Sequence, residues 1–392
     1  MDRAPKVVLL IESSRGAGRA LLCGIAQYAH DHGPWSFYWE PRGLETAWPV
    51  VEGLEADGII LRGVAQLDKL LALGVPTVVA GHRSDVASGF VNLVTDSVTI
   101  AQLAAEHLLK CGFKHFAYCG FQSTQLEHTS WSRQRHASFT DRLVAEGFAT
   151  PPSYILSPLN QNWGKERADL ARWLASLPKP VGILACNDDC GVQVMEACKL
   201  AGLAVPSAVG VVGVDNDEVV CGLADPPMSS VVVQFENAGY LAARALDRLM
   251  KGRTDIPGQI LVSASHVFAR RSTDTIAIED PHLARAMRYI RENSRTNLSV
   301  GAVALATGIS RRGLERLFRQ HLDSSILEVI RRERTDQIAR MLVETKRSVR
   351  QISEALGFQD AQHFARYFRS TKKMSPLAWR RKFTLPLSQI GD

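Results

Sequence analysis

Short apolar runs alternate with longer amphipathic stretches through roughly the first two thirds of the chain. Such runs are typical of strands buried on both faces of a parallel sheet, and apolar residues at every third or fourth position predict helices. We expect strands at 7–11, 58–61, 76–80, 115–120, 181–186 and 210–215, and helices at 20–30, 97–110, 131–146, 165–176, 189–201 and 237–250. The alternation of strands and helices starts again after residue 120. The pattern therefore predicts two successive α/β halves, that is, a bilobed domain with a cleft between its lobes.

A different pattern fills the carboxyl-terminal part, where two helical segments are each interrupted by one glycine. Gly308 supplies a left-handed turn in the first segment, and Ser310 is placed to cap the helix that follows. The second segment repeats this order around Gly357, with one more residue between the glycine and the next helix. Apolar residues anchor the two following helices: Leu314, Leu317 and Phe318, then Phe364, Tyr367 and Phe368. One such corner is common in all-helical cores, but two copies predict a double helix-turn-helix.

Residues 325–344 contain no Gly or Pro, and their apolar positions predict one long helix between the two motifs. At 1.5 Å per residue this helix spans about 30 Å, close to the roughly 34 Å between successive major-groove faces of B-DNA. The charge distribution fits such a partner. Residues 281–392 hold 22 Lys and Arg against 10 Asp and Glu, whereas the preceding 280 residues hold 24 against 30. A basic segment on a mildly acidic body indicates that the segment binds a polyanion.

These patterns divide the chain into a ligand-binding effector domain at 1–273, a polar linker at 274–280 and a DNA-binding domain at 281–392, with helix-turn-helix motifs at about 298–321 and 348–370. The last domain resembles the AraC family of transcription regulators in ALATGISRRGLERLF, RTDQIARMLVETKRSVRQISEALGF and HFARYFRSTKKMSPLAWRR. It departs from that family at Ser353, where Ala is usual, and Ser is small enough to fit. The resemblance implies an all-α domain that binds double-stranded DNA.

Residues early in each reading helix should meet base edges, whereas later basic residues should bind phosphates. For base contacts we expect Ser310, Arg311, Arg312 and Glu315 in the first motif and Asp360, Gln362 and His363 in the second. For phosphate contacts we expect Arg316, Arg319, Arg366, Arg369, Lys372 and Lys373. Any single Arg among them could instead lie on a solvated helix face.

Polar residues just beyond the carboxyl ends of the expected strands are candidates for ligand binding, because the cleft of an α/β domain opens there. They are Ser13, Arg19, Asp96, Asn187, Asp188, Asp215 and Asn216. Carboxylates and amides hydrogen-bond sugar hydroxyls, Arg makes forked contacts, and Trp131 offers a flat apolar face to a pyranose ring. Each residue could equally be a helix cap or a surface charge.

The body of the chain resembles the periplasmic-binding-protein-like effector domain of the LacI/GalR regulators in VGVDNDE, in SSVVV with ENAGYLAARAL, and in RRST. Those regulators carry a DNA-binding headpiece at the amino end; we expect none before Lys6, and the AraC-type tail would replace it. The combination resembles the bacterial xylose operon regulators, including Arg19, Trp131 with Arg135, and GVDN. It implies a homodimeric transcription regulator that responds to a small sugar; an activator is the first expectation and a repressor the alternative, and RNA polymerase is a further partner if it activates.

D-xylose is the first candidate effector under this resemblance, with another pentose, a hexose or a non-sugar metabolite as alternatives, because residues 13–18 match that family poorly.

An enzyme or a transport-type binding protein is a further alternative. A dinucleotide fingerprint would need glycine at position 21, which is Leu21. No catalytic motif or metal-ligand spacing occurs, so we expect no catalysis, cofactor or metal. Seven scattered cysteines and the lack of a signal or membrane segment predict a cytoplasmic protein.

Overall fold

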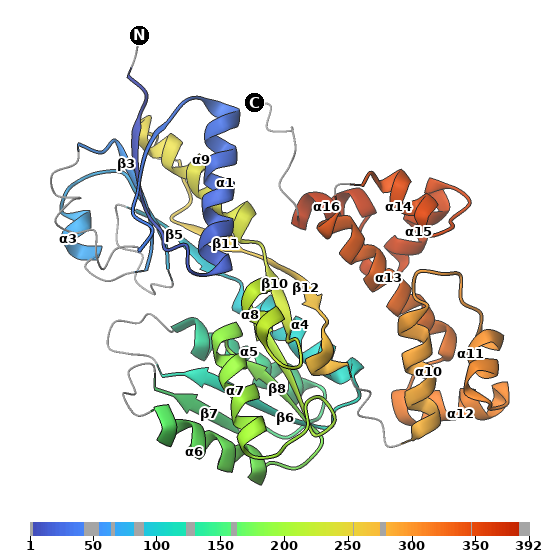
Figure 1. Ribbon diagram of the computed structural model, residues 1–392. Helices are drawn as coiled ribbons and strands as arrows, with labels where there is room; N and C mark the ends of the chain where they lie inside the picture. The colour runs from blue at the N-terminus through green and yellow to red at the C-terminus, as the bar shows by residue number, and fades with distance from the viewer. Residues whose placement is uncertain are drawn as a thin grey trace. The chain divides into compact units, whose positions relative to one another are not determined.

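The computed structural model describes residues 3–42, 55–63, 67–81, 90–122, 130–157, 163–253, 255–274, 280–345 and 347–383. Its contacts divide the chain into two compact units, Met1–Leu108 with Lys114–Asp274, and Leu109–Phe113 with Thr275–Asp392 (Figure 1). The first unit holds two sheets and the second holds helices, so the predicted fold class is confirmed. Most of the expected linker at 274–280 lies outside the described residues.

The first lobe of the first unit is built on a parallel six-stranded sheet. Its strands, in spatial order, are β11 (Gln259–Val262), β5 (Phe90–Thr95), β4 (Thr77–Ala80), β3 (Gly58–Arg62), β1 (Lys6–Leu10) and β2 (Ser36–Trp39). The apolar runs of β1 and β3 are buried, and they form one core with α3 (Leu67–Leu71). This burial explains why these strands read as continuous apolar runs in the sequence.

The second lobe has its own six-stranded sheet. The order is β12 (Ala264–Phe268), β10 (Ser229–Val233), β9 (Val209–Val214), β8 (Val181–Ala185), β6 (His115–Phe121) and β7 (Ser153–Leu156). All neighbours are parallel except β12, which runs antiparallel to β10. Further helices of this unit are α4 (Ser97–Lys110), α5 (Ser130–Ala145), α6 (Trp163–Ser176), α7 (Asp188–Leu200) and α8 (Glu218–Leu223).

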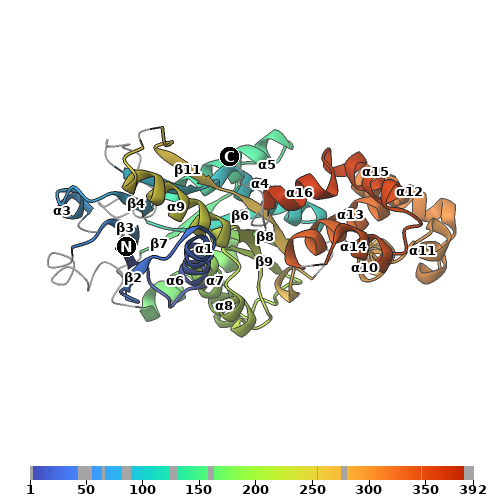
Figure 2. The same ribbon diagram turned by 90° about the horizontal axis from the view of Figure 1, so that it is seen from above.

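The prediction of two successive halves was wrong, because the chain passes between the lobes three times. It leaves the first sheet after β5, returns to it after β10, and leaves it again after β11. Helix α9 (Phe235–Met250), expected in the second half, packs along α1 (Gly16–His32) of the first (Figures 1 and 2). A Cβ on Gly24 would lie 1.9 Å from the carbonyl oxygen of Glu236, so glycine permits this close approach. The two short strands β11 and β12 were missed.

The second unit is all-helical and consists of α10 (Pro281–Glu292), α11 (Val300–Thr307), α12 (Arg311–Leu322), α13 (Ile326–Glu344), α14 (Val349–Ala355), α15 (Ala361–Lys372) and α16 (Pro376–Phe383). The predicted turns are confirmed. Gly308 and Gly357 have left-handed φ angles of 71° and 69°. Ser310 caps α12, and Asp360, one residue further from its glycine, caps α15. Helix α13 is the predicted long helix between the motifs. Within the described ranges, no helix has the length and hydropathy to cross a membrane.

Candidate functional site

A cavity of about 330 Å³ lies in the first unit, where strands of both lobes end. Its lining comprises Glu12, Leu21, Arg62, Gly63, Ala80, Gly81, Leu93, Thr95, Trp131, Arg135, Asn187, Asp215, Phe235 and Val262. Glu12, Arg62 and Ala80 lie at the carboxyl ends of β1, β3 and β4, and Asp215 directly follows β9. Ligands of open α/β sheets bind at such an edge. The cavity is therefore placed where this fold class binds small molecules.

The charged groups of the cavity form two opposed pairs. In the first lobe, an Arg62 guanidinium nitrogen lies 3.5 Å from a carboxylate oxygen of Glu12. In the second lobe, an Arg135 guanidinium nitrogen lies 4.0 Å from the Asp215 carboxylate. Two acidic and two basic side chains leave the lining with no large excess of either sign. Such a lining suits a neutral ligand with many hydroxyl groups better than a strongly charged one.

Arg135 is only 3% exposed and is held on three sides. It donates from Nη1 to the carbonyl oxygen of Cys186 and from Nη2 to the Thr95 hydroxyl, at 3.2 Å. Its guanidinium carbon lies 4.6 Å above the centre of the Trp131 ring. These contacts fix the orientation of the guanidinium, yet its Nε has no hydrogen-bond partner among the described residues. A ligand acceptor could use that donor.

Asp215 carries the complementary acceptor. Its Oδ1 is buried and accepts no hydrogen bond within the described part of the chain. Burial raises the pKa of this carboxyl, and nearby Arg135 opposes that shift. Its φ of 103° is a conformation that side chains rarely adopt, which is frequent at functional sites. A buried polar atom without a partner is costly, so a ligand hydroxyl that donates to Asp215 and accepts from Arg135 would satisfy both.

Residues at all three crossings between the lobes line the cavity: Thr95 at the end of β5, Phe235 at the start of α9, and Val262 at the end of β11. The crossings are also tied to one another. The backbone amide of Asp96 donates to the Val262 carbonyl at 2.9 Å, and the backbone amide of Gln234 donates to the Ser263 carbonyl at 3.0 Å. A molecule in the cavity therefore touches the segments about which the lobes would rotate.

Four of the nine predicted ligand residues lie in this lining: Trp131, Arg135, Asn187 and Asp215. The other five do not: Ser13, Arg19, Asp96, Asp188 and Asn216. Asp96 caps α4 by accepting from the Thr99 amide at 3.0 Å and from its hydroxyl at 2.6 Å. Arg19 donates to the Ser13 carbonyl at 2.7 Å. For Asp96 the alternative of a helix cap describes the observed contacts, whereas Arg19 also pairs with the Asp217 carboxylate at 3.7 Å.

Asp188 and Asn216 are not part of the cavity lining. Asp188 accepts from the Ser230 hydroxyl at 2.5 Å and from the Asp217 amide at 2.7 Å, so its oxygens are engaged. Burial, with the neighbouring Asp215 charge, raises the pKa of Asp188 to about 8. The backbone amide of Asn216 donates to Ser230 Oγ at 3.0 Å. Both residues support the β9 end that presents Asp215.

Sequence reasoning missed Glu12, Arg62, Thr95 and Phe235. A signal for the first two was available, because Glu12 and Arg62 directly follow apolar runs, at the ends of expected strands. The prediction named Ser13, one residue after Glu12, instead. Phe235 had no such signal, since it enters the cavity only because α9 returns to the first lobe.

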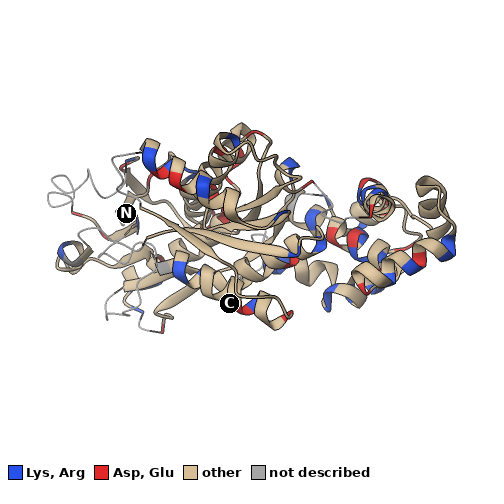
Figure 3. Ribbon diagram, turned by 90° about the horizontal axis from the view of Figure 1, so that it is seen from below, with Lys and Arg blue, Asp and Glu red and all other residues tan. Residues whose placement is uncertain are grey.

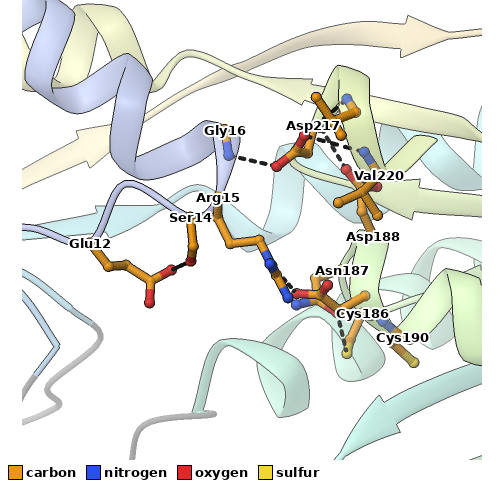
Figure 4. A network of polar contacts seen from close by, with 12 residues as sticks. Glu12, Ser14, Arg15, Gly16, Cys186, Asn187, Asp188, Cys190, Asp217 and Val220 are labelled. Atoms are coloured by element: carbon orange, nitrogen blue, oxygen red, sulfur yellow. Dashed lines mark hydrogen bonds and ion pairs between the residues drawn. The ribbon is translucent and has the colours of Figure 1, made fainter. Parts of the chain in front are cut away.

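A set of contacts joins the two lobes beside the cavity (Figure 4). The Gly16 amide, at the start of α1, donates to Asp217 Oδ2 at 2.6 Å, and Arg15 Nε donates to Asp189 at 3.0 Å. Asp217 also caps α8 through the Val219 amide at 3.1 Å. We call these contacts of Arg15 and Gly16 with Asp189 and Asp217 the interlobe latch. Asn187 of the cavity caps α7, the helix that carries Asp189.

In the second unit, α12 and α15 present exposed polar side chains along one face of each helix. Lys and Arg recur along the helices of this unit (Figure 3). The exposed set includes Arg311, Arg312, Glu315, Arg316, Arg319, Gln362, His363, Arg366, Arg369 and Lys373. Arg311 donates to Glu315 at 2.8 Å, an exposed pair of little net strength that DNA could replace. Ser310 and Asp360 are exposed but are engaged as helix caps.

Lys372 departs from the predicted phosphate-binding group. Its ammonium lies 2.6 Å from the Asp336 carboxylate of α13, and its side chain is only 23% exposed. It also lies 5.2 Å from the centre of the Trp379 ring. These contacts hold Lys372 within the fold of the domain, which argues against its predicted contact with phosphate.

Comparison with known proteins identifies both units. A periplasmic binding protein-like domain matches residues 105–273, and a helix-turn-helix domain matches residues 303–382. The chain is 30% identical to the xylose operon regulatory protein of Haemophilus influenzae, over 96% of this chain and 98% of that one. It is 28% identical to the protein of the same description from Escherichia coli, over 96% of each.

A solved structure described as the xylose-binding transcription activator xylR is similar over 98% of this chain and 99% of that one, with 28% identity and a TM-score of 0.61. A regulator described as a CelR–cellobiose complex matches 69% of this chain at 21% identity and a TM-score of 0.56, which supports the fold of the first unit alone. On its full-length similarity, the chain belongs to the family of xylose operon regulatory proteins, transcription regulators with a periplasmic-binding-protein-like domain and a helix-turn-helix domain.

Proposed function

We propose that the chain binds operator DNA through its two helix-turn-helix motifs and is controlled by a small sugar in the cavity, with D-xylose as the first candidate. The observation that carries the sugar proposal is that two buried atoms, Asp215 Oδ1 and Arg135 Nε, have no hydrogen-bond partner among the described residues, while the Arg135 guanidinium lies over the Trp131 ring. A sugar hydroxyl both donates and accepts, and the apolar face of a pyranose ring packs on an aromatic side chain.

The volume of the cavity is consistent with a ligand the size of a monosaccharide. About 330 Å³ lies at the lower end of the range of about 300–1,000 Å³ that small-molecule sites occupy. The names of the relatives, which include xylose operon regulatory proteins and a xylose-binding activator, support D-xylose as the first candidate. Another pentose or a hexose is the next choice, and a non-sugar metabolite follows.

For the mechanism, we propose that the sugar binds more tightly to the closed arrangement of the lobes than to an open one. The ligand can shift this equilibrium only by that difference in affinity. In a homodimer formed through the effector domains, closure would bias the placement of the two DNA-binding domains on paired half-sites. If the protein is an activator, RNA polymerase is its further partner at the promoter.

A thermal-shift screen of the full chain against monosaccharides tests the sugar proposal. A ligand present at about 100 times its Kd stabilises the folded state by about 2.7 kcal/mol, which raises the melting temperature. D-xylose should give the largest rise among xylose, ribose, arabinose and glucose. If no sugar moves the midpoint while a purine or an amino acid raises it, the sugar assignment is wrong. DNA binding is tested separately by selection from a randomised duplex library.

A further inference from the structure

The two helix-turn-helix motifs of the second unit have separate apolar cores. The first core gathers buried residues of α10, α11 and α12 and ends on α13 at Ile330. The second begins on α13 at Ile338 and continues through α14 and α15. Helix α13 therefore belongs to both halves, and its middle segment, residues 331–337, about two turns long, separates the two cores. Any bending or rolling of the halves would be concentrated in that segment.

Arg334 lies at the centre of this segment and contacts both halves. Its Nη1 donates at 3.2 Å to Asn297 Oδ1, in the segment before α11 of the first motif. Its Nη2 donates at 2.6 Å to the Leu356 carbonyl, in the turn of the second motif. The guanidinium carbon lies 4.4 Å from the centre of the Phe358 ring and 5.7 Å from that of Tyr367. One side chain thus connects the two motifs.

The surroundings of Arg334 are unusual for a cation. The residue is 5% exposed, and no carboxylate forms an ion pair with it within the described ranges. Its Nε has no hydrogen-bond partner there either. A buried charge without an opposite charge is expensive, so a residue that served only to fill space would be better apolar. A planar fork of donors with a fixed geometry is what Arg offers and Lys or Met cannot.

Neighbouring contacts attach α13 to the second motif and, through Asp336, to Lys110 at 2.8 Å, but not to the first motif. The Thr335 hydroxyl donates to that of Thr371 at 3.4 Å, and Asp336 holds Lys372 at 2.6 Å, both on α15. These contacts connect the second motif to α13 but do not involve the first motif. Arg334 with Asn297 supplies the polar connection to that motif.

We propose that Arg334 is a positioning residue that fixes the setting of α12 relative to α15 and so determines the distance between half-motifs that the chain accepts in its operator. The inference rests on the proposed binding of DNA by both motifs. The 19 residues of α13 span about 28 Å, so a tilt of about 10° at its middle would displace one reading helix by a few ångströms. That is comparable with the rise of about 3.4 Å per base pair.

The test compares the full-length wild type with Arg334→Lys, Arg334→Met and Asn297→Ala. Asn297 is exposed, so its truncation removes the link to the first motif with little effect on folding. Arg331→Lys is the matched control, since Arg331 is exposed one turn earlier on the same helix. The DNA is the duplex selected by the wild type from a random library, together with versions in which one base pair is inserted or deleted between the half-motifs.

We expect the wild type and the Arg331→Lys control to lose about tenfold or more in affinity on either altered duplex, the cost of roughly one misplaced contact. The Arg334 variants and Asn297→Ala should lose less than about threefold, and so discriminate poorly between spacings, while remaining folded by thermal unfolding. If they discriminate as sharply as the wild type, or weaken on all three duplexes by one common factor, Arg334 does not position the motifs. If the wild type selects no duplex, the proposed DNA binding fails as well.

Discussion

Replacing Asp215 by Asn should separate ligand binding from stability, because the two are expected to change in opposite directions. The substitution keeps the size of the side chain and removes a buried negative charge. Its backbone has a positive φ of 103°, and Asn tolerates positive φ better than most residues. Burial raises the pKa of this carboxyl, so the folded state is less favourable with the charge than without it. We therefore expect the ligand-free variant to be as stable as the wild type or more stable at neutral pH.

The magnitude of the binding loss follows from the atom that is changed. In the proposed complex, a sugar hydroxyl donates to the Asp215 carboxylate, and a hydrogen bond to a charged group contributes about 1.5–3 kcal/mol. Losing it corresponds to a decrease in affinity of about 10- to 150-fold. The estimate leaves out the attraction between Arg135 and Asp215, whose closest charged atoms are 4.0 Å apart, because that attraction is present in the ligand-free protein as well.

Calorimetric titration with D-xylose and thermal unfolding without ligand provide the two measurements. Asp141→Asn is the matched control, since this residue lies on the exposed surface of α5, the helix that carries Arg135. The control should bind as the wild type does. An Asp215→Asn protein that binds the sugar within about threefold of the wild type would refute the proposed hydrogen bond. An equal loss of affinity and of stability would indicate a structural role for Asp215.

Three further predictions concern other parts of the chain. Asp217→Ala removes the carboxylate that accepts from backbone amides in the first turns of both α1 and α8, so the free energy of unfolding should fall by about 1–2 kcal/mol. Sugar affinity should fall as well, because the interlobe latch is weakened. Unchanged affinity in calorimetry would show that the interlobe latch does not contribute to ligand binding. The pKa of Asp188 is about 8, above the ordinary value of about 4, so the folded state keeps a proton that the unfolded state loses. The free energy of unfolding should therefore fall as pH rises from about 4 to 8, and Asp188→Asn should reduce that slope in denaturant titrations. On DNA, Arg311→Ala should relax base preference, whereas Arg319→Ala should weaken all sequences alike and lower the salt slope by about one; the same loss of specificity from both would contradict the assignment.

The DNA-binding domain could be predicted closely because its signals are local. A glycine with positive φ, a capping side chain and an apolar anchor lie within about two helical turns of one another, so Gly308, Ser310 and Leu314 define the first motif without knowledge of distant contacts. The burial of Lys372 was not predictable in this way. Its partner Asp336 lies 36 positions earlier, and nothing in the local pattern of α15 distinguishes Lys372 from an exposed lysine.

The effector domain was predictable in its elements but not in its connections. An apolar run such as 259–262 has the same pattern whichever sheet it joins, so the return of β11 to the first lobe depends on tertiary packing. The close approach of α9 to α1 at Gly24 and Gly239 likewise becomes visible only when the two helices are side by side. The candidate site divides in the same way. Strand-end residues such as Asp215 could be found from the sequence, whereas Phe235 could not.

The three crossings of the chain between the lobes also suggest how ligand binding in the cavity could change the angle between the lobes. Thr95, Phe235 and Val262 each belong to a different crossing, and all three line the cavity. A ligand held by one lobe alone would be indifferent to the angle between the lobes and could shift no equilibrium between open and closed states. A ligand that contacts every crossing, and that bridges Arg135 and Asp215 of one lobe to Glu12 and Arg62 of the other, cannot keep all these contacts when that angle changes. The same residues that would recognise the sugar would therefore supply the difference in affinity that regulation requires.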